Sequence, residues 1–373
     1  MEKREIAEIK KQLAIDKAVI TKISHCYVNG EKEVLSEYIT GGQSISEDEE
    51  YKYLELFKAM LTGAVDKKLL NLSFPTEEES EGGAQNLLYK VSENKREDDV
   101  KRMHRNIIDN LAYGENYTII TGFFSYDVPA KASDGAVLED GETTFEFMLC
   151  AVCPVKMSKA GLTFNVSEGK FEEITQIPVV EKPVLGFMFP AFNDRACDIH
   201  NMLYFSKKED EIHEELISTL TGDKPPVSSK EQRTIFEKIV EEVTNDNADF
   251  ELVKNIHDRI TEKLDNSKLE GPQSLILGKE EIRDILVEAG VSDDNMTKFN
   301  RVYEESGADE IDGFNAGNLM DVGKFDIESP DIKVKVSPDK TDLVEQKVID
   351  GRKCLVISLE GNNIEVNGLY VNV

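Results

Sequence analysis

The sequence is poor in the features that mark secreted, membrane-spanning and disulfide-stapled proteins. It has no tryptophan and only five cysteines among 373 residues. No stretch approaches the roughly 18 unbroken apolar residues of a membrane-spanning helix, and the N-terminal MEKREIAEIKKQL lacks the apolar core of a secretory signal. The unevenly spaced cysteines do not resemble a disulfide framework. These absences predict a cytoplasmic protein with reduced thiols and no membrane partner.

Signatures of nucleotide-driven and hydrolytic enzymes are also missing. The sequence contains no G-x-x-x-x-G-K-[ST], no G-x-G-x-x-G and no G-x-S-x-G motif. Basic residues are outnumbered, with 44 Lys and Arg against 73 Asp and Glu, for a net charge of −29. Such a field repels phosphate backbones, because nucleic-acid affinity comes from cations that displace counterions. Solubility explains the charge most simply; nucleic-acid mimicry and a basic partner are the alternatives.

What is present is enough for a packed core and an α+β fold. The chain is 40% hydrophobic and long enough for two domains. Apolar residues recur at helical spacing near both ends of the first hundred residues, and then alternate at the spacing of strands. An Asn29-Gly30 hairpin turn and a capping box at Ser46 and Glu49 punctuate the early part. The expected elements are helices at 2–13 and 97–112, strands at 117–128, 144–155 and 161–166, and a hairpin loop at 129–141.

One stretch, from Gly186 to Gly222, sets ionisable residues between two apolar runs. Ser206 and Glu209 predict a capping box for the helix that closes at Gly222. The Pro-containing break that follows predicts a domain boundary. We therefore expect a mixed α+β domain with an antiparallel sheet at 1–222 and a second domain at 228–373. The second comprises a helical block (228–310) and a β-meander (330–373), with tight-turn signals at Asp350-Gly351 and Asn367-Gly368.

Asp194, Arg195, Asp198 and His200 are the candidate catalytic residues of this stretch. If residues 196–204 form one extended strand, Asp198 and His200 share a face. A carboxylate beside an imidazole is suited to acid–base chemistry or metal binding. The alternative is structural, because Asp and Asn before a strand are ordinary turn residues and Arg locks such turns with charge-assisted hydrogen bonds. The structural alternative is favoured.

Cys150, Cys153, Cys197 and His200 would supply four zinc ligands on paper. The first pair lies in FEFMLCAVCPVKM, which has the composition of a buried strand. Residues three apart on a strand point to opposite faces, and no glycine makes the tight turn of a zinc knuckle. The thiols are therefore expected to be small buried hydrophobes, and no cofactor is predicted.

Local basic clusters are the candidate contacts for nucleic acid. Lys333 and Lys335 alternate with apolar residues in Ile332-Lys-Val-Lys-Val336, and a weaker cluster lies at Lys95-Arg96 and Lys101-Arg102. Two lysines on one strand face match phosphate spacing, but they also match the solvent side of an edge strand. The net charge disfavours direct nucleic-acid binding.

Several runs resemble one bacterial family. They are VLGFMFPAFNDRACDIHNMLYFSKKEDEIHEELI with LCAVCPVKMS before it, EIAEIKK and ITKISHCYVNG near the N-terminus, and VIDGRKCLVISLEGNNIEVNG near the C-terminus. This family is catalogued as domain of unknown function 4317, and the resemblance implies no activity, substrate or catalytic residue. The order of helices and strands after Pro225-Pro226 is also similar to that of bacterial nucleoid-associated proteins, a likeness of arrangement only.

The leading functional hypothesis is a non-enzymatic binding protein with a protein or nucleoprotein partner, which binds through its C-terminal half and carries no metal. A homo-oligomer is compatible with it. One alternative is a hydrolase-like enzyme centred on Asp194, Asp198 and His200, with or without a metal. A second is an acidic mimic that sequesters a basic partner, which requires negative charge gathered on one face.

Overall fold

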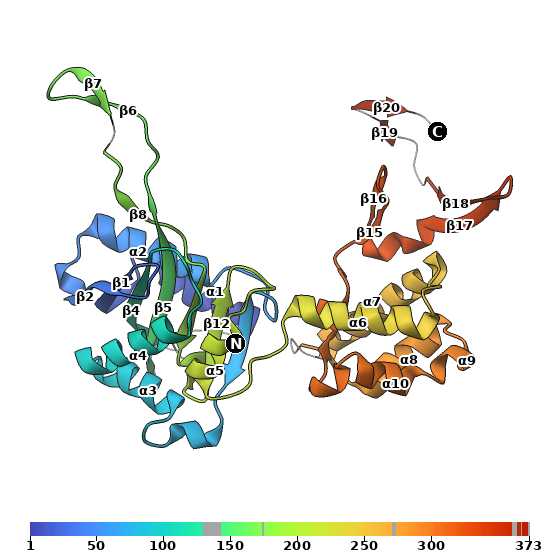
Figure 1. Ribbon diagram of the computed structural model, residues 1–373, viewed down its shortest axis with the longest axis horizontal. Helices are drawn as coiled ribbons and strands as arrows, with labels where there is room; N and C mark the ends of the chain where they lie inside the picture. The colour runs from blue at the N-terminus through green and yellow to red at the C-terminus, as the bar shows by residue number, and fades with distance from the viewer. Residues whose placement is uncertain (130–142, 174, 271–273, 360–363, 367, 372–373) are drawn as a thin grey trace. The chain divides into compact units, whose positions relative to one another are not determined.

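The computed structural model describes residues 1–129, 143–173, 175–270, 274–359, 364–366 and 368–371 (Figure 1). The chain forms two compact units, Met1–Ser228 and Ser229–Val373. The first unit contains a large antiparallel sheet with helices on both faces, and the second contains a group of helices followed by small antiparallel sheets. The predicted α+β class is therefore confirmed. No helix in the described part of the chain is long and apolar enough to cross a membrane.

The sheet of the first unit has the strand order β2-β1-β4-β5-β9-β12-β3, and β8 pairs with the far end of β5. All neighbours pair antiparallel. The two central strands coincide with the predicted ones, because their β-branched and aromatic residues suit a buried sheet. The strands are β1 Val19–Val28, β2 Val34–Gly41, β3 Leu69–Ser73, β4 Tyr117–Val128, β5 Thr143–Met157, β8 Pro178–Val180, β9 Leu185–Phe189 and β12 Asn201–Ser206.

Each face of this sheet has its own apolar core. Helices α3 (Ala84–Asn94), α4 (Glu97–Asn110) and α5 (Glu214–Thr221) cover one face, and α1 (Lys3–Gln12) and α2 (Glu47–Met60) cover the other (Figure 1). The alternation of strand side chains assigns neighbouring residues of β5 to different cores. The capping box at Ser46 is confirmed, since its hydroxyl accepts the N–H of Glu49 at 3.3 Å.

Local expectations fail at two turns of this unit. The turn at Asn29-Gly30 belongs to a five-residue loop, because Asn29 Oδ1 accepts the N–H groups of Glu31 and Glu33. The predicted capping box at Ser206 is wrong. Ser206 ends β12, its hydroxyl donates to the carbonyls of Lys208 and Glu211, and α5 begins only at Glu214. The predicted loop at 129–141 lies outside the described residues from residue 130 onward.

The second unit packs its helices around a separate core that includes Phe236, Ile260, Ile285 and Phe314. Its helices are α6 Ser229–Thr244, α7 Phe250–Glu270, α8 Lys279–Ala289, α9 Asp293–Met296, α10 Phe299–Glu305 and α11 Ala316–Leu319, and β13 Ile276–Leu277 pairs with β14 Phe314–Asn315. Short 3-10 helices in the chain are η1 Gly42–Ser44, η2 Thr76–Glu79, η3 Ala308–Glu310 and η4 Pro338–Leu343.

The C-terminal strands pair within three hairpins, and within the described residues each hairpin is a two-stranded sheet of its own. They differ from the expected continuous meander because each strand pairs across its own turn and stops there. Asp350 and Gly351 form one such turn with positive φ, as their dipeptide predicts. Asn367 lies outside the described residues. The hairpins are β15 Phe325–Glu328 with β16 Lys333–Val336, β17 Val344–Ile349 with β18 Arg352–Ile357, and β19 Ile364–Val366 with β20 Leu369–Val371.

Candidate functional site

The residues predicted as a catalytic site form a tight, docked hairpin. Strands β10 (Ala191–Asn193) and β11 (Ala196–Asp198) pair with each other, and the turn between them is Asp194 and Arg195. Both turn residues have positive φ, 51° and 58°, as a two-residue hairpin turn requires. The polar cluster is therefore a turn whose backbone is held in a conformation uncommon for side-chain-bearing residues.

Helix α1 holds this turn in place. The Asp194 N–H donates to Glu5 Oε1 at 2.7 Å. The Arg195 guanidinium forms an ion pair with Glu8, with Nη2 to Oε1 at 2.9 Å and Nε to Oε2 at 3.1 Å. The Tyr126 hydroxyl donates to Glu8 Oε1 at 2.9 Å. These charge-assisted bonds fasten the docked hairpin to a helix almost two hundred residues away in sequence.

Asp198 is likewise engaged in local structure. Its carboxylate accepts from Asn193 Nδ2 at 2.7 Å, Asn201 Nδ2 at 2.8 Å and the His200 N–H at 3.0 Å. Partial burial acts to raise the pKa of Asp198, but these hydrogen bonds outweigh it and hold the pKa below its usual value. The bond from His200 turns the chain between β11 and β12, so residues 196–204 are not the single strand expected.

His200 consequently does not face Asp198 with its side chain. Its Nδ1 lies 2.9 Å from Glu79 Oε1, and its side chain is 61% exposed. The structure therefore places Asp194, Arg195 and Asp198 in one hairpin, the first two in its turn and Asp198 at the end of β11, and the imidazole of His200 contacts a different carboxylate, that of Glu79.

The four candidate zinc ligands are placed apart. Cys150 lies in the core under α3, α4 and α5, whereas Cys153 lies in the core under α1 and α2, on the opposite face of the sheet. Cys197 is exposed on the docked hairpin. Burial raises the pKa of Cys150 to about 12 and also raises that of Cys153. Among the described residues, these cysteines do not form a group with metal-binding spacing.

The candidate nucleic-acid lysines lie on β16, where acidic residues balance them. Lys333 forms an ion pair with Glu328 at 2.7 Å, and Lys335 is paired across the hairpin with Asp326. A phosphate would have to compete with carboxylates on the same two strands. The geometry offers no cationic face in this hairpin.

A family model described as Domain of unknown function (DUF4317) matches residues 1–369. The protein belongs to this family. The resemblance in the sequence is thereby confirmed. A search of curated proteins and a search of solved structures each gave no match. Family membership assigns no activity, so the functional surface of this DUF4317 protein has to be inferred from its own residues.

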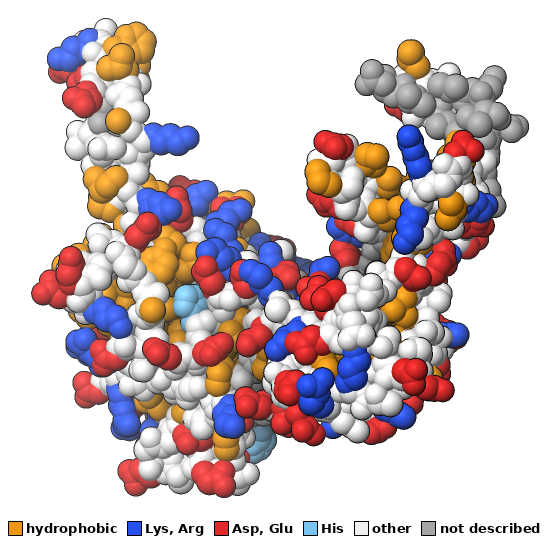
Figure 2. All heavy atoms as spheres, turned by 45° about the vertical axis from the view of Figure 1, so that its right-hand side comes forward, with side chains coloured by type: hydrophobic (Ala, Val, Ile, Leu, Met, Phe, Trp, Pro, Cys, Tyr) orange, Lys and Arg blue, Asp and Glu red, His pale blue; other side chains and the backbone are white. Residues whose placement is uncertain are grey.

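The most unusual described surface of this DUF4317 protein is a projecting arm, formed by residues 157–173 and 175–180. Beyond Pro154, strand β5 leaves β4 and continues with β8, and strands β6 (Leu162–Asn165) and β7 (Lys170–Glu173) form the outer hairpin (Figure 1). Apolar side chains lie along it in the upper left of Figure 2. Those at least 41% exposed are Met157, Leu162, Phe164, Val166, Phe171, Ile177, Val179 and Val180.

The outer hairpin of the arm has one apolar and one polar face. Phe164 is paired with Phe171 across the strands, their rings lie 5.1 Å apart, and Leu162 shares this face by its spacing of two. On the other face, Asn165 Nδ2 donates to the Glu172 carboxylate at 2.8 Å. The polar face is therefore internally bonded, and the apolar face is open to solvent.

Sequence reasoning identified the strand at 161–166 but not its exposure. The alternation Leu162-Thr163-Phe164-Asn165 indicates a strand with one apolar face, and such a face is normally assumed to meet a core. The signal that could have shown otherwise is local. The segment lies between turn-rich sequences, and its hairpin is too short to be stable without a covering layer.

A cavity of about 810 Å³ in the second unit is lined by parts of α6, α7 and β15. His257, 2% exposed, lies at its wall, with its ring 5.1 Å from that of Phe325 and Nδ1 3.3 Å from Asp258 Oδ1. The cavity lining mixes apolar side chains with acidic and basic ones. This arrangement can accept an apolar group, but its residues define no reaction.

Proposed function

We propose that this DUF4317 protein is a cytoplasmic, non-enzymatic binding protein that recognises another protein through the apolar face of its arm. The observation that carries the proposal is the uncovered face of Leu162, Phe164 and Phe171, with exposures of 73, 50 and 71%. Soluble proteins rarely leave a large contiguous apolar surface in water unless it serves an interaction. The interaction surface is thus assigned to the first unit, whereas the sequence pointed to the C-terminal half.

The size of the surface suits a specific protein interface. Eight apolar side chains of the arm are at least 41% exposed. The three that share the apolar face of the outer hairpin, Leu162, Phe164 and Phe171, offer on the order of 300 Å² at roughly 100 Å² each, about half the area of an aromatic side chain. An apolar patch of this size is often functional on a soluble protein, and it can anchor a larger interface. A pair of aromatic residues at the centre has the composition of an interface hot spot.

The charge of the chain indicates what kind of protein fits. A net charge of −29 makes two copies repel each other and attracts a cationic surface. We therefore propose a partner with an apolar cleft rimmed by Lys and Arg. On the face drawn in Figure 2, acidic and basic side chains intermingle, which favours an apolar anchor with electrostatic guidance over mimicry of nucleic acid.

The geometry gives less support to the other hypotheses. An acid–base enzyme at Asp198 would need a free carboxylate, and this one accepts three hydrogen bonds. Direct nucleic-acid binding at Lys333 would need a cation without a partner, and this one is paired with Glu328. The basic partner can also be the protein component of a nucleoprotein. The experiment below distinguishes a direct protein contact from one that nucleic acid mediates.

The test is site-specific photo-crosslinking in cells of the organism that encodes the protein. A photoreactive phenylalanine replaces either Phe171 on the apolar face or Glu172 on the polar face. These neighbours have the same distance from the body of the unit but opposite directions. The proposal predicts one heterologous crosslinked protein from position 171, with several-fold less product from position 172. The same product should form in a lysate treated with nuclease before irradiation, and its yield should fall when the salt concentration is raised before irradiation.

Three outcomes would overturn the proposal. Equal crosslinking from both positions would show that the faces are not distinguished. A product of twice the chain mass alone would show that the arm contacts a second copy. Loss of the product on nuclease treatment would show that nucleic acid mediates the contact.

A further inference from the structure

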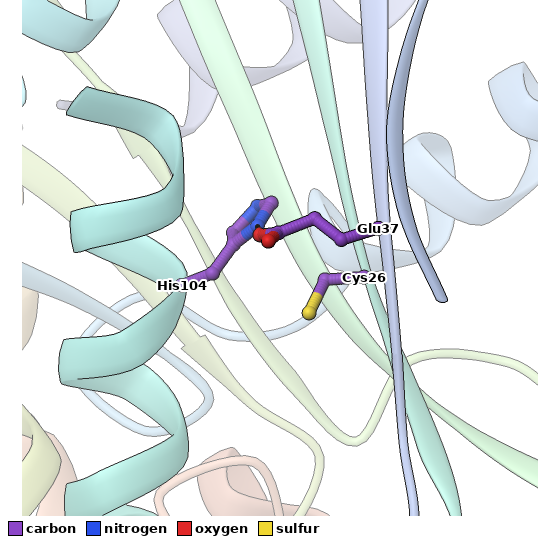
Figure 3. A group of neighbouring side chains, drawn as sticks. All are labelled: Cys26, Glu37 and His104. Atoms are coloured by element: carbon purple, nitrogen blue, oxygen red, sulfur yellow. Dashed lines mark hydrogen bonds and ion pairs between the residues drawn. The ribbon is translucent and has the colours of Figure 1, made fainter. Parts of the chain in front are cut away.

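A group of side chains that can bind a metal ion lies under helix α4, and it has no part in the proposed role of the arm. Cys26 on β1 and Glu37 on β2 are direct cross-strand partners, and His104 on α4 lies over them. One ligand atom from each residue lies within 4.8 Å of the other two. Figure 3 shows the three side chains entering the same space between the helix and the two strands.

His104 is incompletely hydrogen-bonded, which its burial makes costly. The residue is 1% exposed. Nδ1 lies 2.7 Å from Glu37 Oε1, but Nε2 is buried and has no hydrogen-bond partner among the residues that the structure describes. A buried polar atom without a partner costs about 1–3 kcal/mol. An ion pair between Glu37 and His104 that only joined β2 to α4 would use one ring nitrogen, Nδ1. It would not explain why the second polar nitrogen, Nε2, is buried at this position.

The donor set matches one class of ion. Thiolate, imidazole and carboxylate together are the ligands of zinc, and three protein ligands with one open position are typical of reactive zinc sites. From the usual bond lengths, tetrahedral ligand atoms are roughly 3.3–3.8 Å apart. Because the ligand atoms lie within 4.8 Å of one another, the widest separation has to shrink by at most about 1.5 Å. Glu37 is 19% exposed on an edge strand, and its carboxylate can move by this amount by exchanging its hydrogen bond with His104 for a bond to the ion.

Burial keeps the Cys26 thiol protonated before an ion arrives. It raises the pKa of the Cys26 thiol to about 12, and the Glu37 carboxylate adds to this effect. The hydrogen bond from His104 lowers the pKa of Glu37, so the carboxylate is charged. When a divalent ion binds, the thiol proton passes to solvent and a metal–sulfur bond replaces the sulfur–hydrogen bond.

We propose that Cys26, Glu37 and His104 form a binding site for a divalent transition metal of the zinc class, with a water molecule as fourth ligand on the solvent side of Glu37. The site is independent of partner recognition by the arm. It is local to the first unit, where it joins edge strand β2 to helix α4.

The test is a titration of the chelator-treated, reduced full-length protein with Co²⁺. A thiolate–cobalt bond gives a charge-transfer absorption band in the near ultraviolet, which identifies the sulfur ligand directly. The matched control is Cys153→Ala, because Cys153 is equally buried but lies in the core of the opposite face. We expect wild type and Cys153→Ala to bind one Co²⁺ per chain, displaced by Zn²⁺, and Cys26→Ala to lose the band.

Glu37→Gln keeps the proposal testable if Cys26→Ala unfolds, since a half-buried edge position tolerates this isosteric change. It should weaken Co²⁺ binding at least tenfold, and Zn²⁺ should raise the unfolding midpoint of wild type but not of this variant. The absence of the band from the wild type would overturn the proposal. So would a band of full intensity in Cys26→Ala, or equal metal affinity for wild type and Glu37→Gln.

Discussion

Two short hairpins of the first unit have similar length, but one is packed against the rest of the unit and the other is exposed. The docked hairpin β10–β11 carries Phe192, which is fully buried, and its turn is clamped to α1 through Arg195. The arm hairpin β6–β7 carries Phe164 and Phe171, which are half to mostly exposed and touch mainly each other. One hairpin satisfies both its apolar and its polar groups within the chain, and the other satisfies only its polar groups.

Whether a hairpin is covered by the rest of the chain therefore indicates a functional surface better than the chemical type of its residues does. The docked hairpin holds acidic and basic side chains that suggest catalysis, but Arg195 and Asp198 are both engaged in hydrogen bonds within the chain. The arm holds ordinary apolar residues, but they have no covering layer among the described residues. An exposed apolar surface without a covering layer is what a partner protein can bury.

The largest expected contrast is between the two phenylalanines. Phe192→Ala should lower the free energy of unfolding by about 3–5 kcal/mol, because the ring is buried 4.8 Å from that of Phe145 and its loss leaves a cavity. Phe171→Ala should change it by less than about 1 kcal/mol, since an exposed ring has little burial to lose. Urea unfolding of both variants measures the difference, and equal destabilisation would contradict the assignment of the hairpins.

The turn charges should show a smaller contrast. Arg195→Ala removes the guanidinium from a partly buried Glu8 and should cost about 2 kcal/mol. Lys170→Ala, at the turn of the arm, breaks an exposed pair with Glu168 and should cost less than about 0.5 kcal/mol. The same urea titration applies. A stable Arg195→Ala protein that lost partner crosslinking would instead return the docked hairpin to the status of a functional site.

Acid should weaken the docked hairpin selectively through Asp198. Its pKa in the folded state lies below the value of the unfolded chain, so its stabilisation is complete above about pH 5. The stabilisation is lost as the pH falls below the unfolded value of about 3.9 and through the folded pKa. Asp198→Asn should therefore be less stable than wild type by about 1 kcal/mol at neutral pH, and the difference in unfolding free energy should narrow as the pH falls below the unfolded pKa of about 3.9. A difference that stays constant as the pH falls through this range would assign the effect to the shape of the side chain and not to its charge.

How far the sequence predicted the structure depended on the distance between interacting residues. Strands β4 and β5 were predicted to within two residues, because their β-branched and aromatic composition is local. The role of Arg195 was open, because its partner Glu8 is 187 positions away and no pattern near either residue connects them. No sequence pattern connects His104 with Glu37 for the same reason, since Glu37 lies 67 positions earlier and on a different element.

The exposed arm shows a different limit. Alternation predicts that a strand has an apolar face, but it does not reveal whether that face meets a core, and Phe164 has the same local pattern as a buried residue. The capping box expected at Ser206 failed for a related reason. The motif was present, but pairing of β12 with β9 and β3 extended the strand through Ser206 and displaced the start of the helix.

The most direct test of the account compares two arm variants expressed in the same cells. Each variant is affinity-purified without a crosslinker, and the co-purified amount of the partner identified by crosslinking from position 171 is measured. Phe164→Ser with Phe171→Ser removes the apolar face, and Thr163→Ala with Lys170→Ala alters the polar face of the same hairpin. The account predicts equal unfolding midpoints within about 2 °C for these exposed changes. It also predicts at least tenfold less co-purified partner for the apolar-face variant and an unchanged amount for the polar-face variant. Equal recovery of the partner from both variants would contradict it.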